Sequence, residues 1–381
     1  MKIAFLTPEY PHPKTGNSGG LGTSIKNLAS GLLEQGVTVR ILVYGQKKDG
    51  FFDDNGVLIQ QIKNVKFKGL SWLLTRIKLE KIINALYLNK EIDVIEAPDW
   101  TGITSFIKPK KCPVTIRLNG SDTYFCHLDN RKVKWKNKFH EKRALQNADG
   151  LLSVSQFTAD LTNTVFGLNK VFKIIPNPID SKLFQNNFQY SPTSQNILYF
   201  GSLIRKKGLL ELPLIFNKVI ETYPEAKLIL VGKDVPDIIS GNSSTWEMMM
   251  KLFSEKALKN VEYLGSVPYE QIKQKIQQSK ICVFPSFAEA FPVSWLEAMA
   301  MEKPIIASNI GWANEMIDEG KNGFLVNPKD HDLYAQRIIE FLENEKLCLE
   351  AGKFARIKVE EHFDIKILAK KNIEFYKTFK K

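Results

Sequence analysis

Short apolar runs alternate with amphipathic segments along almost the whole chain. Each run has the length and the aliphatic content of a strand that is covered on both faces. In the first half the expected strands are 2–7, 37–44, 93–98, 113–118, 150–155 and 172–177; in the second half they are 197–201, 227–232, 261–265, 281–286, 304–308 and 323–326. After the first run, Ile25, Leu28, Ala29 and Leu32 share one helical face. Strands and helices in alternation predict an α/β protein with parallel sheets.

The alternation is interrupted at Phe184–Asn196, which is polar and has neither a helical nor a strand period. With 381 residues the chain suits two domains. We predict two doubly wound, Rossmann-like domains, 1–188 and 189–361, facing each other across a cleft. A C-terminal helix, 362–381, could pack back on the N-terminal domain or on the second one. Ligands of such sheets bind outside the carboxyl ends of the strands, so the strand-end loops should carry the chemistry.

Charge distinguishes the two halves. Residues 1–190 contain 27 Lys and Arg against 16 Asp and Glu, whereas 191–381 contain 26 against 25. The densest basic run is Arg131–Arg143, and it is either a solvated helix face or a surface attracted to phospholipid or nucleic acid. Trp135 within this run favours a membrane interface. No apolar run approaches the roughly 20 residues of a membrane span, and the N-terminus does not resemble a signal peptide. We therefore expect a cytoplasmic protein, with a peripheral association with the inner face of the membrane as a hypothesis.

Two glutamates lie in the otherwise apolar stretch FPSFAEAFPVSWLEAMA, 284–300. Glu289 belongs to the loop after a buried strand, and Glu297 to the helix that follows. One interpretation of Glu297 is structural: Ser294 and Glu297 have the spacing of a capping box. In the other, the helix N-terminus faces a phosphate and the two carboxylates each hold hydroxyl groups. A nucleotide-sugar has a central diphosphate with a polyol on each side and would satisfy all these features.

Two further strand-end loops have suitable chemistry. Arg205 and Lys207 precede Gly208 in YFGSLIRKKG, where their charge could neutralise a leaving diphosphate. Gly19 and Gly20 open a helix after the first strand and allow a close backbone approach to a ligand. These glycines do not form a dinucleotide fingerprint. The four cysteines and five histidines have no metal or redox spacing.

The chain resembles the retaining glycosyltransferases of family 4, which have the GT-B fold. The similarity covers nearly the whole chain and rests on the segments SGGLG, IIPNPID, YFGSLIRKKG, VEYLGSVPYEQI, VFPSFAEAFPVSWLEAMAMEKPIIAS and GWANEMIDEGKNGFLVNPKD. The resemblance implies that Glu289 holds hydroxyls of the donor sugar beside the reacting carbon and that Glu297 holds the ribose of the nucleotide. It assigns the diphosphate to Lys207 and a place near the phosphates to Gly20.

The same resemblance implies that the backbone around Phe291, Pro292 and Val293 faces the sugar and the diphosphate. The family usually has an arginine where this chain has Ser202, and we expect Arg205 to supply that charge. Where the family commonly has a histidine, this chain has Asn119, which can orient a sugar but cannot carry a proton at neutral pH.

The resemblance also implies a metal-independent transfer with retention of configuration, in which the leaving diphosphate helps to take the acceptor's proton. The expected donor is a UDP- or GDP-sugar. The expected acceptor is a saccharide or lipid-linked intermediate of surface polysaccharide or lipopolysaccharide synthesis, and no nucleic acid is expected as a partner. Two alternatives remain: a nucleotide-sugar epimerase or phosphorylase on the same scaffold, and a non-catalytic nucleotide-sugar-binding protein.

Overall fold

The computed structural model describes residues 1–16, 18–109, 112–186 and 195–380, which form two compact units. The first unit comprises Met1–Asp180 and Phe363–Lys381, and the second comprises Ser181–His362. The predicted boundary at 188/189 falls within 187–194, which lies outside the described residues. The segment after His362 belongs to the first unit.

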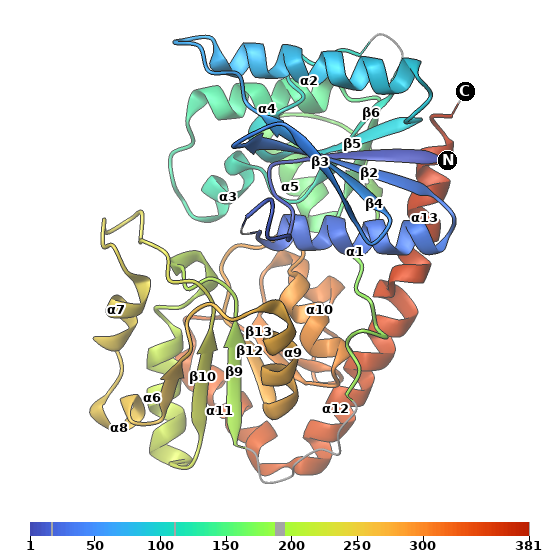
Figure 1. The fold of residues 1–381 in the computed structure, drawn as a ribbon. Coiled ribbons are helices and arrows are strands. Elements are labelled where there is room, and N and C mark those ends of the chain that lie inside the picture. Colours follow the sequence, from blue (N-terminus) through green and yellow to red (C-terminus); the bar gives the residue numbers. More distant parts are fainter. Residues whose placement is uncertain (17, 110–111, 187–194, 381) are drawn as a thin grey trace. The chain divides into compact units, whose positions relative to one another are not determined.

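The first unit is built on an eight-stranded sheet with the order β3-β4-β2-β1-β5-β6-β7-β8 (Figure 1). Only the β3–β4 pair is antiparallel within this described sheet. Its strands are β1 (Lys2–Thr7), β2 (Thr38–Gln46), β3 (Gly50–Asp54), β4 (Val57–Lys63), β5 (Val94–Pro98), β6 (Val114–Leu118), β7 (Gly150–Ser153) and β8 (Lys173–Ile174). Its helices are α1 (Gly20–Glu34), α2 (Ser71–Leu88), the 3-10 turn η1 (Trp100–Gly102), α3 (Asp122–Leu128), α4 (Trp135–Asn147), α5 (Gln156–Phe166) and α13 (Ile365–Lys377).

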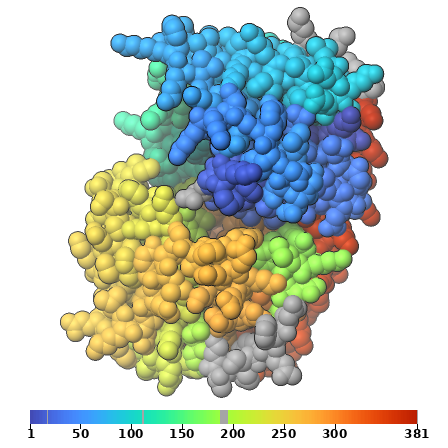
Figure 2. All heavy atoms as spheres, viewed as in Figure 1, coloured from blue at the N-terminus to red at the C-terminus, as the bar shows by residue number. Residues whose placement is uncertain are grey.

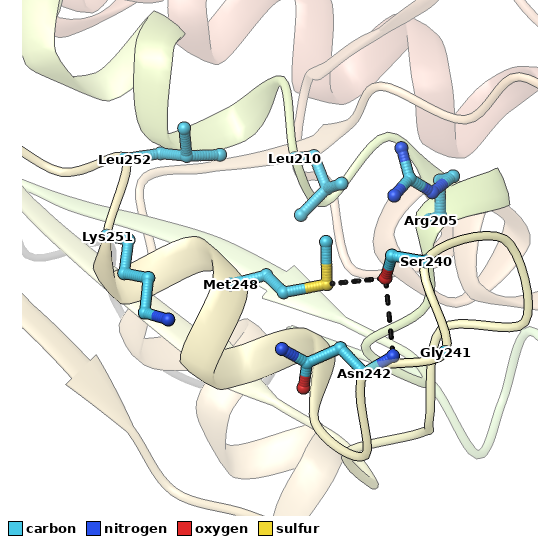
Figure 3. A pocket seen from close by; sticks show the side chains of 8 residues that line it. All are labelled: Arg205, Leu210, Ser240, Gly241, Asn242, Met248, Lys251 and Leu252. Atoms are coloured by element: carbon cyan, nitrogen blue, oxygen red, sulfur yellow. Dashed lines mark hydrogen bonds between the residues drawn. The ribbon is translucent and has the colours of Figure 1, made fainter.

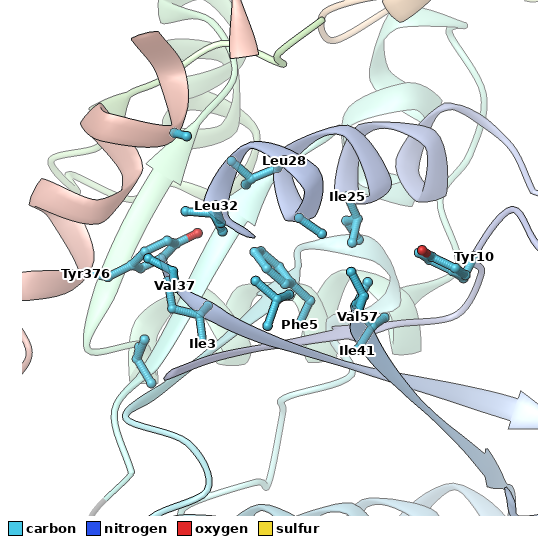
Figure 4. Close-up of a cluster of buried hydrophobic side chains, with 14 of the residues drawn as sticks. Ile3, Phe5, Tyr10, Ile25, Leu28, Leu32, Val37, Ile41, Val57 and Tyr376 are labelled. Atoms are coloured by element: carbon cyan, nitrogen blue, oxygen red, sulfur yellow. The ribbon is translucent and has the colours of Figure 1, made fainter. Parts of the chain in front are cut away.

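The core of the first unit has two layers because alternate residues of each strand point to opposite faces of the sheet. Ile3 and Phe5 of β1 pack with α1 and α13 in one apolar cluster (Figure 4). Ala4 and Leu6 of the same strand pack with α2 in another cluster. A strand that is buried on both faces gives a continuous apolar run, which is the pattern that the sequence shows.

The C-terminal helix α13 is tied to the first unit by close packing and by a buried polar network. A Cβ atom added to Gly31 of α1 would lie 2.5 Å from Ile365 Cγ1, so glycine is what lets α13 approach α1 this closely. The guanidinium of Arg117 on β6 pairs with Glu96 on β5 at 2.7 Å. Tyr376 of α13 donates to the same carboxylate at 2.6 Å. Each of these polar groups therefore has a buried partner, which a buried ion pair needs.

The second unit has a six-stranded parallel sheet in the order β11-β10-β9-β12-β13-β14. Its strands are β9 (Asn196–Phe200), β10 (Lys227–Val231), β11 (Val261–Tyr263), β12 (Ile281–Phe284), β13 (Ile305–Ser308) and β14 (Gly323–Val326). Its helices are α6 (Leu212–Thr222), α7 (Thr245–Met250), α8 (Glu255–Leu258), α9 (Tyr269–Gln278), α10 (Val293–Ala300), α11 (His331–Glu343) and α12 (Glu345–Lys358), with 3-10 turns η2 (Arg205–Lys207) and η3 (Gly311–Glu315) and the π-helical turn η4 (Val359–Phe363).

The predicted α/β class with two doubly wound sheets is confirmed. One feature that the alternation does not predict is the hairpin of β3 and β4. It turns at Asn55 and Gly56, which both have positive φ, as expected for a two-residue hairpin turn. In each sheet the strand order reverses beside the first strand, at β1/β5 and at β9/β12. The loops after these strands are where a ligand of a doubly wound sheet is expected.

Candidate functional site

The loops that follow β9 and β12 are held together backbone to backbone. The carbonyl of Lys206 accepts hydrogen bonds from the N–H groups of Phe287 and Ala288, at 2.8 and 3.2 Å. Gly208 has φ +71°, and a Cβ atom added there would lie 1.8 Å from the carbonyl oxygen of Pro285. Only glycine fits both this conformation and this contact. The turn η2 is therefore fixed against the loop that carries Glu289.

This packing brings Lys207 to Glu289. Lys207 Nζ lies 3.0 Å from Glu289 Oε1, with 21% and 12% of the two side chains exposed. Ser286 Oγ donates to the same carboxylate oxygen at 3.2 Å. The predicted sugar-binding acid and the predicted diphosphate-binding lysine thus form one ion pair in the second unit.

Glu297 is the second acid of this site and is almost fully buried, with 4% exposed. Its Oε1 accepts a hydrogen bond of 2.5 Å from the hydroxyl of Tyr269, the first residue of α9. Burial raises the pKa of Glu297 to about 7, while the hydrogen bond from Tyr269 and the charge of Lys207 oppose the rise. Lys207 therefore acts electrostatically on both glutamates.

The capping-box interpretation of Glu297 is wrong. The N-cap of α10 is Pro292, and Ser294 is already inside the helix, which has no side-chain cap among the described residues. Glu297 consequently lies beyond the first turn and bonds to Tyr269 of another helix. Phe291, Pro292 and Val293, which the resemblance placed against the sugar and diphosphate, are buried where α10 begins.

Arg205 lies in the same turn as Lys207 but has a different partner. Its guanidinium binds both carboxylate oxygens of Asp237, at 2.9 and 2.7 Å. This pairing, opposed by desolvation, holds the pKa of Asp237 well below its usual range. Arg205 also lines an open pocket of about 610 Å³ together with Ser240 and Lys251 (Figure 3). Ser202, where the family usually has an arginine, accepts a hydrogen bond from the Tyr199 hydroxyl through its backbone carbonyl.

In the first unit, Gly19 and Gly20 lie at the N-terminus of α1, after the surface loop that follows β1 (dark blue in Figure 2). Glu9 of that loop accepts hydrogen bonds from the N–H groups of Gly19 and Gly22, at 3.0 and 2.9 Å. A carboxylate of the chain itself thus binds at the positive end of the helix. Sequence reasoning missed Glu9, although an acid two residues beyond a strand was a usable signal.

Asn119 follows β6 in the first unit and is partly buried. Its backbone N–H donates to Asp99 Oδ1 at 3.0 Å, which fixes the segment 119–120. Asp99 Oδ2 is buried and has no hydrogen-bond partner among the described residues. Burial raises the pKa of Asp99 to about 7, and the nearby Glu141 adds to the rise.

The sequence contains an Asp-x-Asp, Asp330–Asp332, and paired carboxylates of this kind can bind a metal ion. Asp330 caps α11 by accepting from the N–H of Leu333. Asp332 pairs with Lys218 at 2.6 Å, and His331 contacts Glu211 at 2.7 Å. The described part of the chain contains no cluster of three His, Cys, Asp or Glu side chains suited to a metal. Nor does any described helix have the length and hydrophobicity needed to cross a membrane.

Comparisons with known proteins identify the family of the chain. A family model described as glycosyl transferases group 1 matches residues 182–358, and one described as Glycosyltransferase Family 4 matches residues 18–183. An uncharacterized glycosyltransferase of Methanocaldococcus jannaschii is 26% identical over 99% of this chain and 98% of its own length. A GDP-mannose-dependent monoacylated alpha-(1-6)-phosphatidylinositol monomannoside mannosyltransferase of Corynebacterium glutamicum is 22% identical over 68% of this chain and 70% of its own.

Among solved structures, HepE of Anabaena in complex with UDP-glucose superposes with a TM-score of 0.74 and 20% identity, over 99% of this chain and 100% of that one. At this identity the likeness establishes the fold. The two family models follow each other along the chain and meet at 182–183, close to the change from the first unit to the second at Asp180 and Ser181. The chain belongs to the family 4-like glycosyltransferases and has the GT-B fold.

Proposed function

We propose that the protein transfers a hexosyl group from a UDP- or GDP-sugar to a hydroxyl of a saccharide or lipid-linked acceptor, with retention of the anomeric configuration. The acceptor is an intermediate of surface polysaccharide or lipopolysaccharide synthesis. One observation carries the proposal: Lys207 contacts Glu289 at 3.0 Å, and its charge also opposes the rise that burial causes in the pKa of Glu297.

A cation that contacts one acid and acts electrostatically on a second suits a nucleotide-sugar better than a simple anion. The diphosphate needs positive charge, which Lys207 supplies. Glu289 and Glu297 would repel a phosphate but can each accept two hydrogen bonds from neighbouring hydroxyls. We assign the sugar hydroxyls to Glu289 and the ribose hydroxyls to Glu297. The solved relative with UDP-glucose and the relative that uses GDP-mannose support a nucleotide-sugar donor.

In the proposed reaction the bond between the anomeric carbon and the diphosphate oxygen breaks, and the acceptor oxygen forms its new bond on the same face. The proton of the acceptor hydroxyl moves to the leaving diphosphate. Lys207 stabilises the charge that grows on that group, and Glu289 orients the sugar. Asn119 orients the sugar without exchanging a proton. Because a lysine supplies the positive charge, we expect transfer to continue in the presence of a chelator.

The choice of acceptor draws on one relative whose name gives a phosphatidylinositol mannoside as its substrate. A lipid-linked acceptor would bring the reaction to a membrane surface. The excess of basic residues in 1–190 is compatible with such a surface, because anionic lipids attract Lys and Arg.

The test begins with thermal-shift measurements against UDP, GDP, ADP and CDP and the matching sugar nucleotides. Glu297→Ala should weaken binding of the preferred nucleotide by roughly 10- to 100-fold, because the ribose loses its acceptor. Glu289→Ala should leave nucleotide binding within about 3-fold but lower transfer by on the order of 10³-fold. Glu270→Ala, on the exposed side of α9, is the control for both variants.

Three results would contradict the proposal. Consumption of the donor without any acceptor would indicate an epimerase. A coloured protein that releases sugar phosphate would indicate a phosphorylase with a pyridoxal cofactor. Tight nucleotide binding without turnover of any acceptor would indicate a binding protein.

A further inference from the structure

Four rings form a cluster on the surface of the first unit; they come from the beginning of α2, the segment after η1 and the middle of α4. Figure 1 labels α2 and α4, the two helices that contribute to it. We call Trp72, Phe106, Phe139 and His140 the aromatic cluster. Trp72 lies 5.8 Å from Phe106 and 5.1 Å from His140, and Phe106 lies 6.3 Å from Phe139, measured between ring centroids. Trp72, Phe106 and Phe139 remain 43%, 37% and 48% exposed.

The exposed apolar surface continues along α4. Trp135 precedes Phe139 by four residues, so both side chains lie on one face of the helix. Trp135 is 72% exposed, and Phe67 just before α2 is 57% exposed. Isolated exposed apolar residues are ordinary, but a contiguous patch of large aromatic side chains indicates a contact surface.

The charge around this patch is positive. In 131–147 the only acidic residue is Glu141. Glu141 is 1% exposed, and its carboxylate accepts hydrogen bonds from the N–H groups of Asp122 and Thr123 at the start of α3. It therefore does not present its charge to solvent. The exposed charged side chains of this segment are the cationic Lys132, Lys134, Lys136 and Lys138.

The arrangement of the rings distinguishes between partners. A saccharide or a nucleobase stacks on an open ring face. Here the Arg143 guanidinium lies 4.3 Å from the centroid of Phe106 and the Arg76 guanidinium lies 5.5 Å from Trp72. The neighbouring rings meet edge to face or tilted. A guanidinium thus already occupies a face of Phe106 and a face of Trp72, whereas a membrane interface needs only an apolar surface with cations beside it.

We propose that the aromatic cluster with Trp135 enters the headgroup region of an anionic phospholipid bilayer, while the lysines of 132–142 bind lipid phosphates. The purpose of this contact rests on the proposed function, because it would hold the enzyme where a lipid-linked acceptor lies. The contact itself needs neither donor nor acceptor. Insertion of aromatic rings also differs from a purely electrostatic attraction, because it resists salt.

The experiment is sedimentation of the full chain with phosphatidylcholine vesicles that contain 30% phosphatidylglycerol or none, at about 0.1 and 0.5 M NaCl. Trp135→Ser with Phe139→Ser should lower the partition coefficient at least 10-fold at both salt concentrations. Gln in place of Lys132, Lys134, Lys136 and Lys138 should lower it at 0.1 M salt only. Phe51→Ser, which removes a 63% exposed ring from β3, is the matched control and should bind like the wild type.

A second measurement tests whether the ring of Trp135 enters the bilayer. Tryptophan fluorescence should be quenched by brominated lipids, and Trp135→Phe should remove a large part of that quenching while UDP binding stays unchanged. Absence of vesicle binding by a chain that binds UDP normally would overturn the membrane proposal and leave the proposed function intact. Binding to an oligonucleotide or an anionic polysaccharide in place of vesicles would also overturn it. Conversely, vesicle binding without any sugar transfer would support the membrane contact and contradict the proposed function.

Discussion

Lys207 Nζ lies 3.0 Å from Glu289 Oε1, across the point where the strand order of the second sheet reverses. The lysine comes from the loop after β9 and the glutamate from the loop after β12. Each side chain is only partly exposed, so the pair is screened less than an ordinary surface ion pair. This is the relationship on which the proposed chemistry depends.

Replacing Lys207 by Met should weaken binding of a nucleoside diphosphate by roughly 10- to 100-fold and lower transfer further, because the charge acts most strongly on the leaving group. Calorimetric titration with UDP and GDP and a transfer assay measure the two effects. Lys206→Met is the control, because its backbone carbonyl still accepts from Phe287 and Ala288. Equal losses in both variants would contradict a specific role of Lys207.

The raised pKa of Glu297, about 7, gives the stability a pH dependence. Between the unfolded value near 4.3 and about 7, the folded state binds a proton that the unfolded state releases. The free energy of unfolding contributed by Glu297 should therefore be highest below pH 4.3 and fall as pH rises through 7. Glu297→Gln should remove this decrease, which is roughly 3–4 kcal/mol at about 1.4 kcal/mol per pKa unit. Urea unfolding between pH 4.5 and 8 tests this.

The pKa values of Asp99 and Glu141 are also raised, so these two acids give the stability a pH dependence of the same sign. The contribution of Glu297 is therefore the difference in the free energy of unfolding between the wild type and Glu297→Gln at each pH. Nucleotide binding should show the opposite trend, because a charged Glu297 accepts the ribose hydroxyls best. Affinity for UDP should fall more steeply below pH 7 in the wild type than in Glu297→Gln, where the terminal phosphate of UDP, with a pKa of about 6, still titrates. An equal pH dependence in the two proteins would contradict the assignment.

Gly208→Ala should destabilise the second unit and abolish activity. Its Cβ atom would lie 1.8 Å from the carbonyl oxygen of Pro285, and φ is +71°. Gly320→Ala is a close control: φ is +73°, and no described atom lies within 4 Å of the added Cβ. In Gly320→Ala the free energy of unfolding should fall only by the backbone strain, about 1–2 kcal/mol. Thermal unfolding of both variants separates the clash from the strain, and similar losses would show that the two loops do not pack as described.

Arg205 and Asp237 should be coupled in stability. Their two-point contact at 2.9 and 2.7 Å predicts a coupling free energy of about 1 kcal/mol or more in a double-mutant cycle with alanine. The same variants test whether Arg205 supplies the charge that is missing at Ser202. If it does, Arg205→Ala weakens UDP binding more than Asp237→Ala does. Equal and small losses of UDP affinity in the two variants would indicate that Arg205 only stabilises the loop at 237–242.

The local pattern predicts more about strands than about contacts. The alternation of apolar runs was sufficient to predict the two parallel sheets, because a strand that is buried on both faces has no polar positions. It was insufficient for β3, which ends in Asp53 and Asp54, and for β4, where Gln60 and Gln61 interrupt the run. It also gave no partner for Arg205, because Asp237 lies 32 residues further along the chain.

The sequence alone determined the succession of buried strands along the chain, the strand-end positions of Glu289 and Lys207, and the glycines of the turns. These properties depend on neighbouring residues, and a short window of sequence contains them. The tertiary structure decided that Lys207 pairs with Glu289, that Glu297 bonds to Tyr269, and that α13 joins the first unit. Such contacts depend on how distant elements pack, because the core fixes the register between segments that no local pattern relates.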